Sequence, residues 1–213
     1  MNLGPQGPGE RGRHDLGITI RAARADDTDA AGLVFDAARP AYRSAAGSEE
    51  RARAVLEGLW PVGGHSASFE NALVAELDGM LVGVLIAFPA RDRYRLHFSL
   101  LRRSLRYGTA RRLPLLALVV PQLVAATPHP PRRAYYVATI AVAPQARRRG
   151  VGSMLAHQAE LEAARRGFAS IVAHTGSRHR PARQALERYG ARATKDRSWG
   201  YVLYVKQVDR SGS

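Results

Sequence analysis

Residues 135–155 read YYVATIAVAPQARRRGVGSML, and this stretch decides the fold. Its first eight residues, Tyr135 to Val142, are rich in aromatic and β-branched side chains and predict a strand. Pro144 ends that strand, a basic turn with glycines follows, and a helix is predicted from about Val151. The first turn of a helix has N–H groups without partners and the positive end of the helix dipole. A strand, a glycine turn and a helix in this order are therefore typical of a phosphate-binding site.

The composition is that of a globular protein without thiol chemistry. The chain has 213 residues, of which 46% are hydrophobic, so one large domain with a buried core is expected. It has no cysteine, which excludes disulfides, thiolate metal sites and a cysteine nucleophile. Residues 1–17 are polar and rich in glycine and proline, so we expect no signal peptide, and the most apolar run, residues 113–126, is too short to span a bilayer. A cytoplasmic protein without a transmembrane segment or a metal is expected.

The charge is strongly basic. The net charge is +14, and every basic residue except Lys195 and Lys206 is an arginine. A basic surface favours polyanionic partners, such as nucleic acid, an anionic membrane or a phosphorylated cofactor. A solvated surface with a general preference for arginine explains most of these charges equally well.

The pattern along the chain predicts a mixture of strands and helices. Residues 1–17 are expected to form a disordered tail, Pro40 to close the first helix, and Asp78-Gly79 to form a hairpin turn. An early hairpin followed by strand–helix–strand units indicates a single α/β domain with a mixed sheet over residues 18–208. Strands are predicted over residues 18–21, 72–77, 80–88, 135–142, 168–173 and 198–208, and helices over about 26–38 (capped by Asp26 or Asp27), 48–59, 94–107, 113–125, 151–166 and 181–189.

Three phosphate-binding motifs compete for the turn at residues 147–153. A P-loop requires Gly-Lys-Ser/Thr after its glycines, and the turn has no lysine. A dinucleotide fingerprint requires a third glycine where Leu155 stands, and an acidic residue at the end of the next strand, where His174 stands. Both of these motifs fit poorly.

The third motif fits well. Residues 147–152 read RRRGVG, which resembles the Arg/Gln-x-x-Gly-x-Gly/Ala signature of the GNAT superfamily of N-acetyltransferases. Five other features resemble the superfamily in the same order: an opening Ile-Arg-x-Ala strand, an Asp-led helix, Val82-Gly83 in the hairpin, Ile-Ala-Val-Ala-Pro before the turn, and a late Pro-Ala-Arg-x-x-Leu-Glu-Arg-x-Gly segment. The resemblance implies a mixed, mostly antiparallel central sheet flanked by helices, with a helical insertion at about residues 91–131 before the central strand.

The resemblance also implies that acetyl-CoA is the co-substrate and that the turn holds its diphosphate. Gly150 and Gly152 lack side chains that would block a diphosphate, and the amides from Arg149 to Ser153 can point at phosphate oxygens. Arg147, Arg148 and Arg149 can add charge-assisted hydrogen bonds. We expect Gly150→Glu to abolish CoA binding and leave the fold intact.

In the family the central strand parts from its parallel neighbour before this turn, and the pantetheine arm binds the strand backbone. Carried over, this implicates Ile140, Ala141 and Val142, with an N–H group among them polarising the thioester carbonyl. The candidate cofactor-binding residues are therefore Ile140, Ala141, Val142, Arg147, Arg148, Arg149, Gly150, Val151, Gly152 and Ser153.

The turn does not carry the proton transfers. The resemblance implies direct attack of a primary amine on acetyl-CoA in a ternary complex, so a base must take a proton from the amine. The family often has a tyrosine in the pattern Asn-x-Ala-x-x-x-Tyr, but this chain has Arg180 and Leu186 at those positions. Tyr189, one helical turn further on, is the candidate general acid. The candidate bases are Glu70, Glu76, His97, His129 and His174.

The expected acceptor is a small-molecule or peptide amine. The insertion at residues 91–131 could cover the acceptor site, lie on an anionic membrane or form the face of a homodimer. The alternative function is a non-catalytic CoA-binding or basic nucleic-acid-binding regulatory module on the same fold. Nucleic acid is not expected as a partner, because no aromatic residues interleave the arginines of the turn and no nucleic-acid motif is present.

Overall fold

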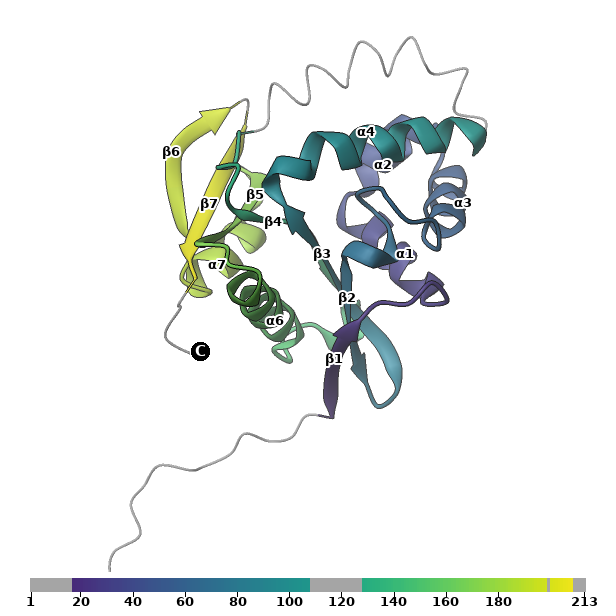
Figure 1. Cartoon of the computed structure of the whole chain (residues 1–213). Helices are drawn as coiled ribbons and strands as arrows, with labels where there is room; N and C mark the ends of the chain where they lie inside the picture. The colour runs from purple at the N-terminus through teal and green to yellow at the C-terminus, as the bar shows by residue number, and fades with distance from the viewer. Residues whose placement is uncertain (1–16, 108–127, 199, 209–213) are drawn as a thin grey trace, which may run out of the picture.

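A seven-stranded sheet with the strand order β1-β2-β3-β4-β5-β7-β6 forms the centre of the protein. The computed structural model describes residues 17–107, 128–198 and 200–208 (Figure 1). Every neighbouring pair of strands is antiparallel except β4 and β5. The prediction of a mixed, mostly antiparallel sheet flanked by helices is confirmed. The strands are β1 (Ile18–Ala22), β2 (Ala72–Leu77), β3 (Met80–Pro89), β4 (Tyr135–Val142), β5 (Ser170–Gly176), β6 (Arg192–Ser198) and β7 (Tyr201–Gln207).

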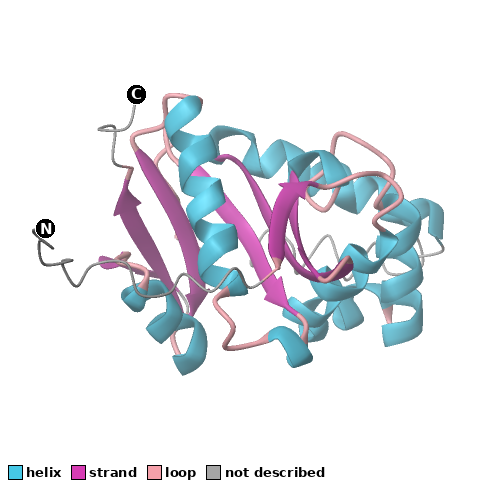
Figure 2. Ribbon diagram, turned by 90° about the horizontal axis from the view of Figure 1, so that it is seen from below, coloured by secondary structure: helices cyan, strands magenta, loops and turns pink. Residues whose placement is uncertain are grey.

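Helices cover both faces of the sheet, as Figures 1 and 2 show. On one face, α1, α3 and α4 pack with the side chains of Val84 and Tyr136, and on the other α6 packs with Leu85 and Val137. Consecutive residues of a strand point to opposite faces, so the sheet separates two cores. The helices are α1 (Thr28–Ala37), α2 (Arg39–Ala46), α3 (Glu49–Leu59), α4 (Arg93–Ser104), α6 (Val151–Arg165) and α7 (Arg180–Arg188).

Gly83 lets α6 lie close to the sheet. A Cβ atom at this position would stand 2.9 Å from Val151 Cγ1 and 3.1 Å from Leu155 Cδ1. Any larger residue would push the first turn of α6 outward. The glycine of the hairpin therefore helps to place the turn that precedes α6.

The hairpin and several helix ends agree with the sequence-based expectations. Asp78 and Gly79 have φ values of 52° and 77°, as a two-residue hairpin turn requires. Ser48 caps α3, since its Oγ accepts a hydrogen bond from Arg51 N. Asp27 is the residue before α1, but its carboxylate does not cap that helix. It accepts two hydrogen bonds of 2.7 Å from the guanidinium of Arg21 instead.

The structure has one helix that the sequence analysis missed. Pro40 was expected to end the first helix, but it lies in the first turn of the additional helix α2. Proline is favourable there because its missing N–H would have no helical partner in any case. Gly47, in the left-handed conformation with φ 98°, ends α2.

The C-terminal strands also differ from the prediction. β5 begins at Ser170 and extends to Gly176, three residues beyond the predicted end, because its pairing with β7 continues to Tyr201. The predicted strand over residues 198–208 is β7, which begins at Tyr201, whereas strand β6, over Arg192–Ser198, was not predicted. The largely polar sequence of β6 carries little strand signal, and its pairing with β7 makes it a strand.

Parts of the prediction lie outside the described residues. These are the tail at residues 1–16 and the helix over residues 113–125. The first part of the predicted insertion is α4, followed by a short 3-10 turn at Leu105–Tyr107. In the part of the chain that the structure describes, no helix has the length and apolar character needed to cross a membrane.

Candidate active site

The parallel strands β4 and β5 part after three residue pairs, the last of which is Val137 with Ala173. β4 continues along β3 to Val142, whereas β5 continues along β7 to Gly176. The parting begins at a bulge in β4. The neighbouring residues Ile86 and Ala87 of β3 pair with Thr139 and Val137 of β4, so Ala138 is the extra residue. A bulge bends its strand and re-aims the residues that follow, which accounts for the divergence.

The divergence exposes backbone groups of β4. Ala143 N–H donates to Val82 O at 2.8 Å, and backbone groups alternate in direction along a strand. The N–H groups of Ile140 and Val142 therefore point away from β3, toward the side where β5 has left. No strand among the described residues pairs with this edge beyond Val137. Ile140 is 37% exposed, although it lies within the sheet.

The turn after β4 places three amides at the beginning of α6. The first helical hydrogen bond runs from Met154 N to Gly150 O at 3.0 Å. The N–H groups of Val151, Gly152 and Ser153 therefore precede the helical ladder and have no helical carbonyl to bind. Together with the dipole of the 15-residue helix, they form a site that favours an anion.

Two glycines leave space beside these amides. Gly150 has φ 82° and no atom within 4 Å of the position that a Cβ would occupy. A Cβ at Gly152 would stand 3.7 Å from Val142 Cγ2, which is an ordinary contact. Gly152 is therefore not required by packing. Gly150 is required by its backbone conformation, so Gly150→Glu would also strain the turn, by about 1–2 kcal/mol.

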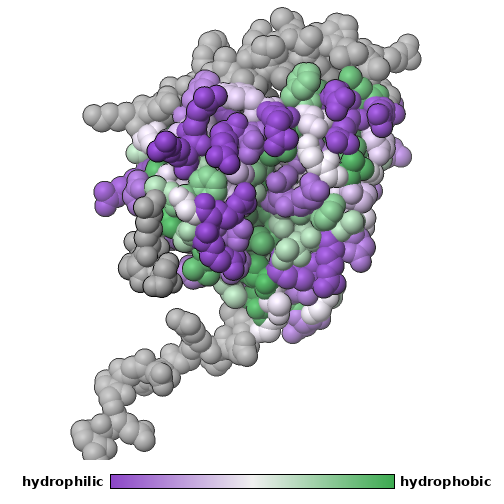
Figure 3. Space-filling view, in the orientation of Figure 1, coloured by the Kyte–Doolittle hydropathy of each residue, from purple (hydrophilic) through white to green (hydrophobic). Residues whose placement is uncertain are grey.

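The three arginines of the turn are exposed, and Figure 3 shows hydrophilic side chains spread over the face that carries α6. Arg147 Nε donates to Val142 O at 3.1 Å, which ties its side chain to the end of β4. Arg148 has φ 64°, an uncommon conformation for a residue with a side chain. Within the described part of the chain, Arg147, Arg148 and Arg149 form no ion pair with a carboxylate.

His174 lies on β5 directly after the point where the strands part. Its Nδ1 is 2.7 Å from Tyr136 Oη, and the two rings stack with an interplanar angle of 13°. Tyr201 of β7 packs edge-on against the imidazole, with ring centroids 5.5 Å apart. No other described residue hydrogen-bonds the imidazole, so Nε2 is free for a ligand.

The surroundings of His174 favour the neutral imidazole. Burial, and then the positive charges of Arg93 and His97, lower the pKa of His174 to about 4. Arg93 is itself buried, and its guanidinium donates to Pro128 O at 3.2 Å and to Tyr94 Oη at 2.6 Å. Burial also raises the pKa of Tyr136. At neutral pH, His174 is therefore uncharged, with a free lone pair on one ring nitrogen, and its low pKa makes it a weak base.

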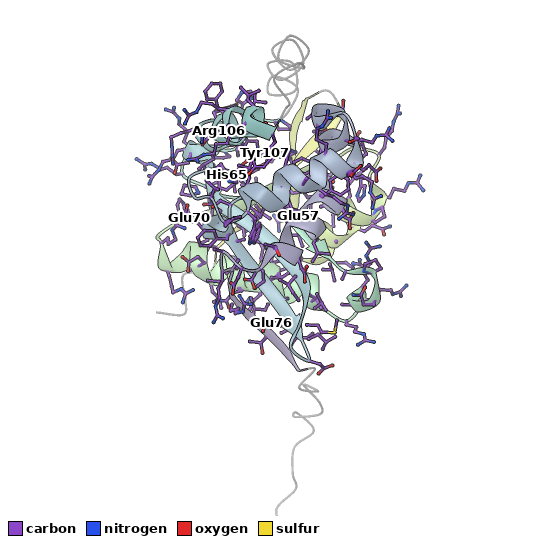
Figure 4. The ribbon with its side chains drawn as sticks, turned by 90° about the vertical axis from the view of Figure 1, so that its right-hand side faces the viewer. Glu57, His65, Glu70, Glu76, Arg106 and Tyr107 are labelled. Atoms are coloured by element: carbon purple, nitrogen blue, oxygen red, sulfur yellow. The ribbon has the colours of Figure 1, made fainter. Side chains whose placement is uncertain are left out.

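The structure separates the other candidate bases from this position. Glu70 accepts a hydrogen bond from Gly64 N at 2.8 Å, and in Figure 4 it lies beside the buried His65. Glu76 is hydrogen-bonded to Arg21 at 2.9 Å. His129 is exposed and contacts the ring of Tyr94. Only His97, whose ring packs against Phe88 beside Tyr136, shares the neighbourhood of His174.

Tyr189 lies between α6, α7 and β7, where its hydroxyl donates to Glu160 Oε2 at 2.6 Å. Lys206 Nζ binds the same oxygen at 2.6 Å and lies 4.2 Å from the centre of the Tyr189 ring. Burial, and then the hydrogen bond to Glu160, raise the pKa of Tyr189. Burial alone would raise the pKa of Glu160 too, but the hydrogen bonds from Lys206 and Tyr189 lower it overall. These contacts join three elements, and they provide a structural role for Tyr189.

Sequence reasoning missed the partners of His174, which are Tyr136, Arg93 and Tyr201. Tyr136 stood in the quoted stretch but was used only as a sign of a strand. The one available signal was His174 itself, a histidine near the end of a predicted buried strand. Among the described residues, no group of three or more histidine and acidic side chains could hold a metal ion.

Comparisons with known proteins agree with this geometry. The model of the "Acetyltransferase (GNAT) family" matches residues 33–191. A search of curated protein sequences finds no match. A crystal structure described as an acetyltransferase has a TM-score of 0.69 at 20% identity, over 90% of this chain and 100% of that chain. An N-acetyltransferase from Staphylococcus aureus Mu50 has a TM-score of 0.65 at 15% identity, over 89% and 100%. The PaiA N-acetyltransferase from Thermoplasma acidophilum, in complex with coenzyme A, has a TM-score of 0.51 at 12% identity, over 89% and 98%. At these identities the solved structures show a shared fold.

Proposed function

Because the chain belongs to the GNAT family of acetyltransferases, we propose that it is an acetyl-CoA-dependent N-acetyltransferase acting on a primary amine. The acceptor would be a small molecule or a peptide, and the amine would attack acetyl-CoA directly in a ternary complex. One observation carries the proposal. The unpaired edge of β4 leads directly into the free amides at the beginning of α6.

The residues of this region fit acetyl-CoA. The amides of Val151, Gly152 and Ser153 would hold the diphosphate, and the arginines of the turn would pair with its phosphate groups. The N–H groups of Ile140 and Val142 would bind the pantetheine arm and polarise the thioester carbonyl. When bound, acetyl-CoA supplies the acetyl group as a thioester that an amine can attack.

We assign the role of general base to His174. In the tautomer with the proton on Nδ1, His174 donates to Tyr136 Oη and has a lone pair on Nε2 for the amine proton. The charge of Arg93 would lower the pKa of an amine bound nearby, as it lowers the pKa of His174. A larger fraction of the amine would then be uncharged and nucleophilic at neutral pH.

The candidate general acid is Tyr189. Tyr189 stays a prediction, since its hydroxyl proton already binds Glu160 in this structure. A thiolate leaving group is a weak base and can take its proton from water, so the reaction does not require Tyr189. The Tyr189→Phe variant separates the two possibilities.

Calorimetric titration with acetyl-CoA, followed by an assay of CoA release with a panel of amines, tests the proposed function. Saturable binding and amine-dependent release of CoA are expected. Absence of both heat and thermal stabilisation would refute the proposal at the binding step, and binding without turnover across the panel would refute the catalytic step. Free amines can be compared with peptides in the same panel.

The alternative is a CoA-binding or nucleic-acid-binding regulatory module without catalysis. It is favoured by the net charge of +14 and by the arginines of the turn, which form no ion pair with a carboxylate of the described residues. Tight, salt-sensitive binding of DNA together with absence of turnover would support it. A cytoplasmic location, a single domain over residues 18–208 and a homodimer stay predictions.

A further inference from the structure

The outward face of α4 carries an apolar stripe, which continues into the turn that follows the helix. Figure 1 shows α4 along the upper edge of the described part of the molecule. The residues of the stripe recur every three or four positions and so lie on one side of the helix; they are Tyr94, Phe98, Leu101 and Leu105. Phe98 is 66% exposed and Tyr94 is 43% exposed, whereas the two leucines are partly buried.

Apolar surface continues from this stripe beside the helix. A cavity of about 140 Å³ lies between α2, α3 and α4, and most of the side chains in its wall are apolar. Leu101 belongs both to the stripe and to the wall, together with Tyr42 of α2 and Val55 of α3. The stripe is therefore the outer part of a larger apolar region, which distinguishes it from a single exposed side chain.

A row of arginines runs beside the stripe. Its members are Arg91, Arg95, Arg102 and Arg106, and all four are exposed. Arg95 stands three residues before Phe98 and Arg102 stands four residues after it, so both are neighbours of that ring on the helix surface. The exposed face of α4 thus has apolar and basic side chains next to each other.

The surrounding residues leave most of this positive charge without a counter-ion. Asp92 is the one acidic residue among the six arginines of residues 91–107, and it lies 3.4 Å from Arg95. The other arginines of the row form no ion pair with a carboxylate of the described residues. Residues 108–127, which come next in the sequence, contain two further arginines and no acidic residue.

An anionic lipid surface complements both properties of this face. A helix with arginines beside phenylalanine, tyrosine and leucine lies in the interface of a bilayer, where its apolar side chains reach the acyl boundary. Each arginine close to the anionic headgroups strengthens the binding. A strand of nucleic acid would also attract the arginines and can stack on Phe98, but it has no apolar phase for Leu101 and Leu105. The combination therefore favours lipid.

We propose that the outward face of α4 binds anionic lipid membranes. The apolar stripe enters the interface, and the arginine row pairs with the lipid phosphates. This contact is peripheral and needs no transmembrane segment. It is independent of the proposed acetyltransferase function, because no residue of the stripe or the row belongs to the proposed cofactor site.

Flotation of the full chain with lipid vesicles tests the inference. Wild type is expected to bind vesicles of phosphatidylcholine and phosphatidylglycerol about tenfold more tightly than vesicles of phosphatidylcholine alone, and salt should weaken this binding. Arg102→Glu should weaken binding to the anionic vesicles about tenfold, because it reverses one charge of the row. Phe98→Ser should also weaken it about tenfold, because it removes the most exposed ring of the stripe.

Two matched variants separate this face from the overall charge and apolarity of the surface. Arg188→Glu makes the same change in net charge at an exposed residue of α7, and Leu161→Ser removes an exposed apolar side chain from α6. Both should change vesicle binding less than about twofold, since charges far from the bilayer are screened. Thermal unfolding checks that all four variants are folded.

Two outcomes overturn the inference. One is absence of binding to the anionic vesicles, in which case nucleic-acid binding or dimerisation that Phe98→Ser abolishes would identify the partner of this face. The other is a loss of vesicle binding that is no larger in Phe98→Ser and Arg102→Glu than in their matched controls. Failure of the proposed function is distinguishable, since it appears as absence of acetyl-CoA binding or turnover, and the vesicle assay needs neither.

Discussion

The turn proposed to hold the cofactor, residues 143–153, and the surroundings of His174 are assembled in opposite ways. All of the proposed phosphate donors lie within one short segment, and three of them are backbone amides at the beginning of α6. The surroundings of His174 come from α4, β4, β5 and β7, through Arg93, Tyr136 and Tyr201. A site built from consecutive backbone groups leaves a motif in the sequence. A site built from distant side chains leaves only isolated residues, whose meaning depends on packing.

The largest expected effect is on the turn. Gly152→Glu should weaken acetyl-CoA binding about 1000-fold, because the carboxylate would stand beside the diphosphate. The fold should remain intact, since a Cβ at Gly152 makes only an ordinary contact and an acidic residue in the first turn of α6 favours the helix. Calorimetry and thermal unfolding measure the two quantities. Gly152→Ala is the control, and undiminished affinity in Gly152→Glu would place the cofactor elsewhere.

A smaller effect is expected from substitutions at His174 and at its partner Tyr136. His174→Gln should lower kcat about 100-fold by removing the proton acceptor, while the Kd for acetyl-CoA changes less than twofold. Tyr136→Phe keeps the imidazole of His174 and should lower kcat about tenfold, since only the orientation of the imidazole is affected. Steady-state assays of CoA release with one amine measure both. Full activity in His174→Gln would end its assignment as the base.

Tyr189→Phe tests whether Tyr189 has only a structural role, through its hydrogen bond to Glu160. Loss of one hydrogen bond should reduce the free energy of unfolding by about 1 kcal/mol, while kcat changes less than threefold. Chemical denaturation and the CoA-release assay measure the two. A hundredfold fall in kcat at unchanged stability would instead support the general acid predicted from the sequence.

The smallest effect concerns the pH dependence of stability. The pKa of His174 is about 4 in the folded protein and about 6.5 in an unfolded chain, so only the unfolded chain gains a proton as pH falls below 6.5. The stabilisation from His174 is thus fully present above pH 6.5 and is lost as pH falls toward 4. Comparing wild type with His174→Gln cancels the contribution of His97. The advantage of wild type should shrink by about 1 kcal/mol between pH 7.5 and 5, after allowing for partial exposure of the imidazole. A constant difference would show that the imidazole is not held neutral.

The fold was predictable where the signal was local. The hairpin at Asp78-Gly79, strand β4 and helix α6 lie where the turn residues and the hydrophobic pattern predict them. Helix α2 was missed because Pro40 can either end a helix or begin one, and only the packing of α2 on α3 decides between them. Strand β6 was missed because its largely polar composition does not predict a strand, and its pairing with β7 makes it one.

The resemblance implied the mostly antiparallel sheet, and the amino-acid sequence alone established the motifs of that resemblance and the turn proposed to hold the diphosphate. These depend on backbone conformation and on neighbouring residues, which the order of amino acids states directly. The folded structure was needed to show that β4 and β5 part at Ala138 and that Tyr189 binds Glu160. It also showed that His174 stands beside Tyr136, whereas the other candidate bases except His97 lie elsewhere. It alone showed a cavity among three helices. Each of these is a contact between residues far apart in the chain, and such contacts exist only after the sheet and helices have packed.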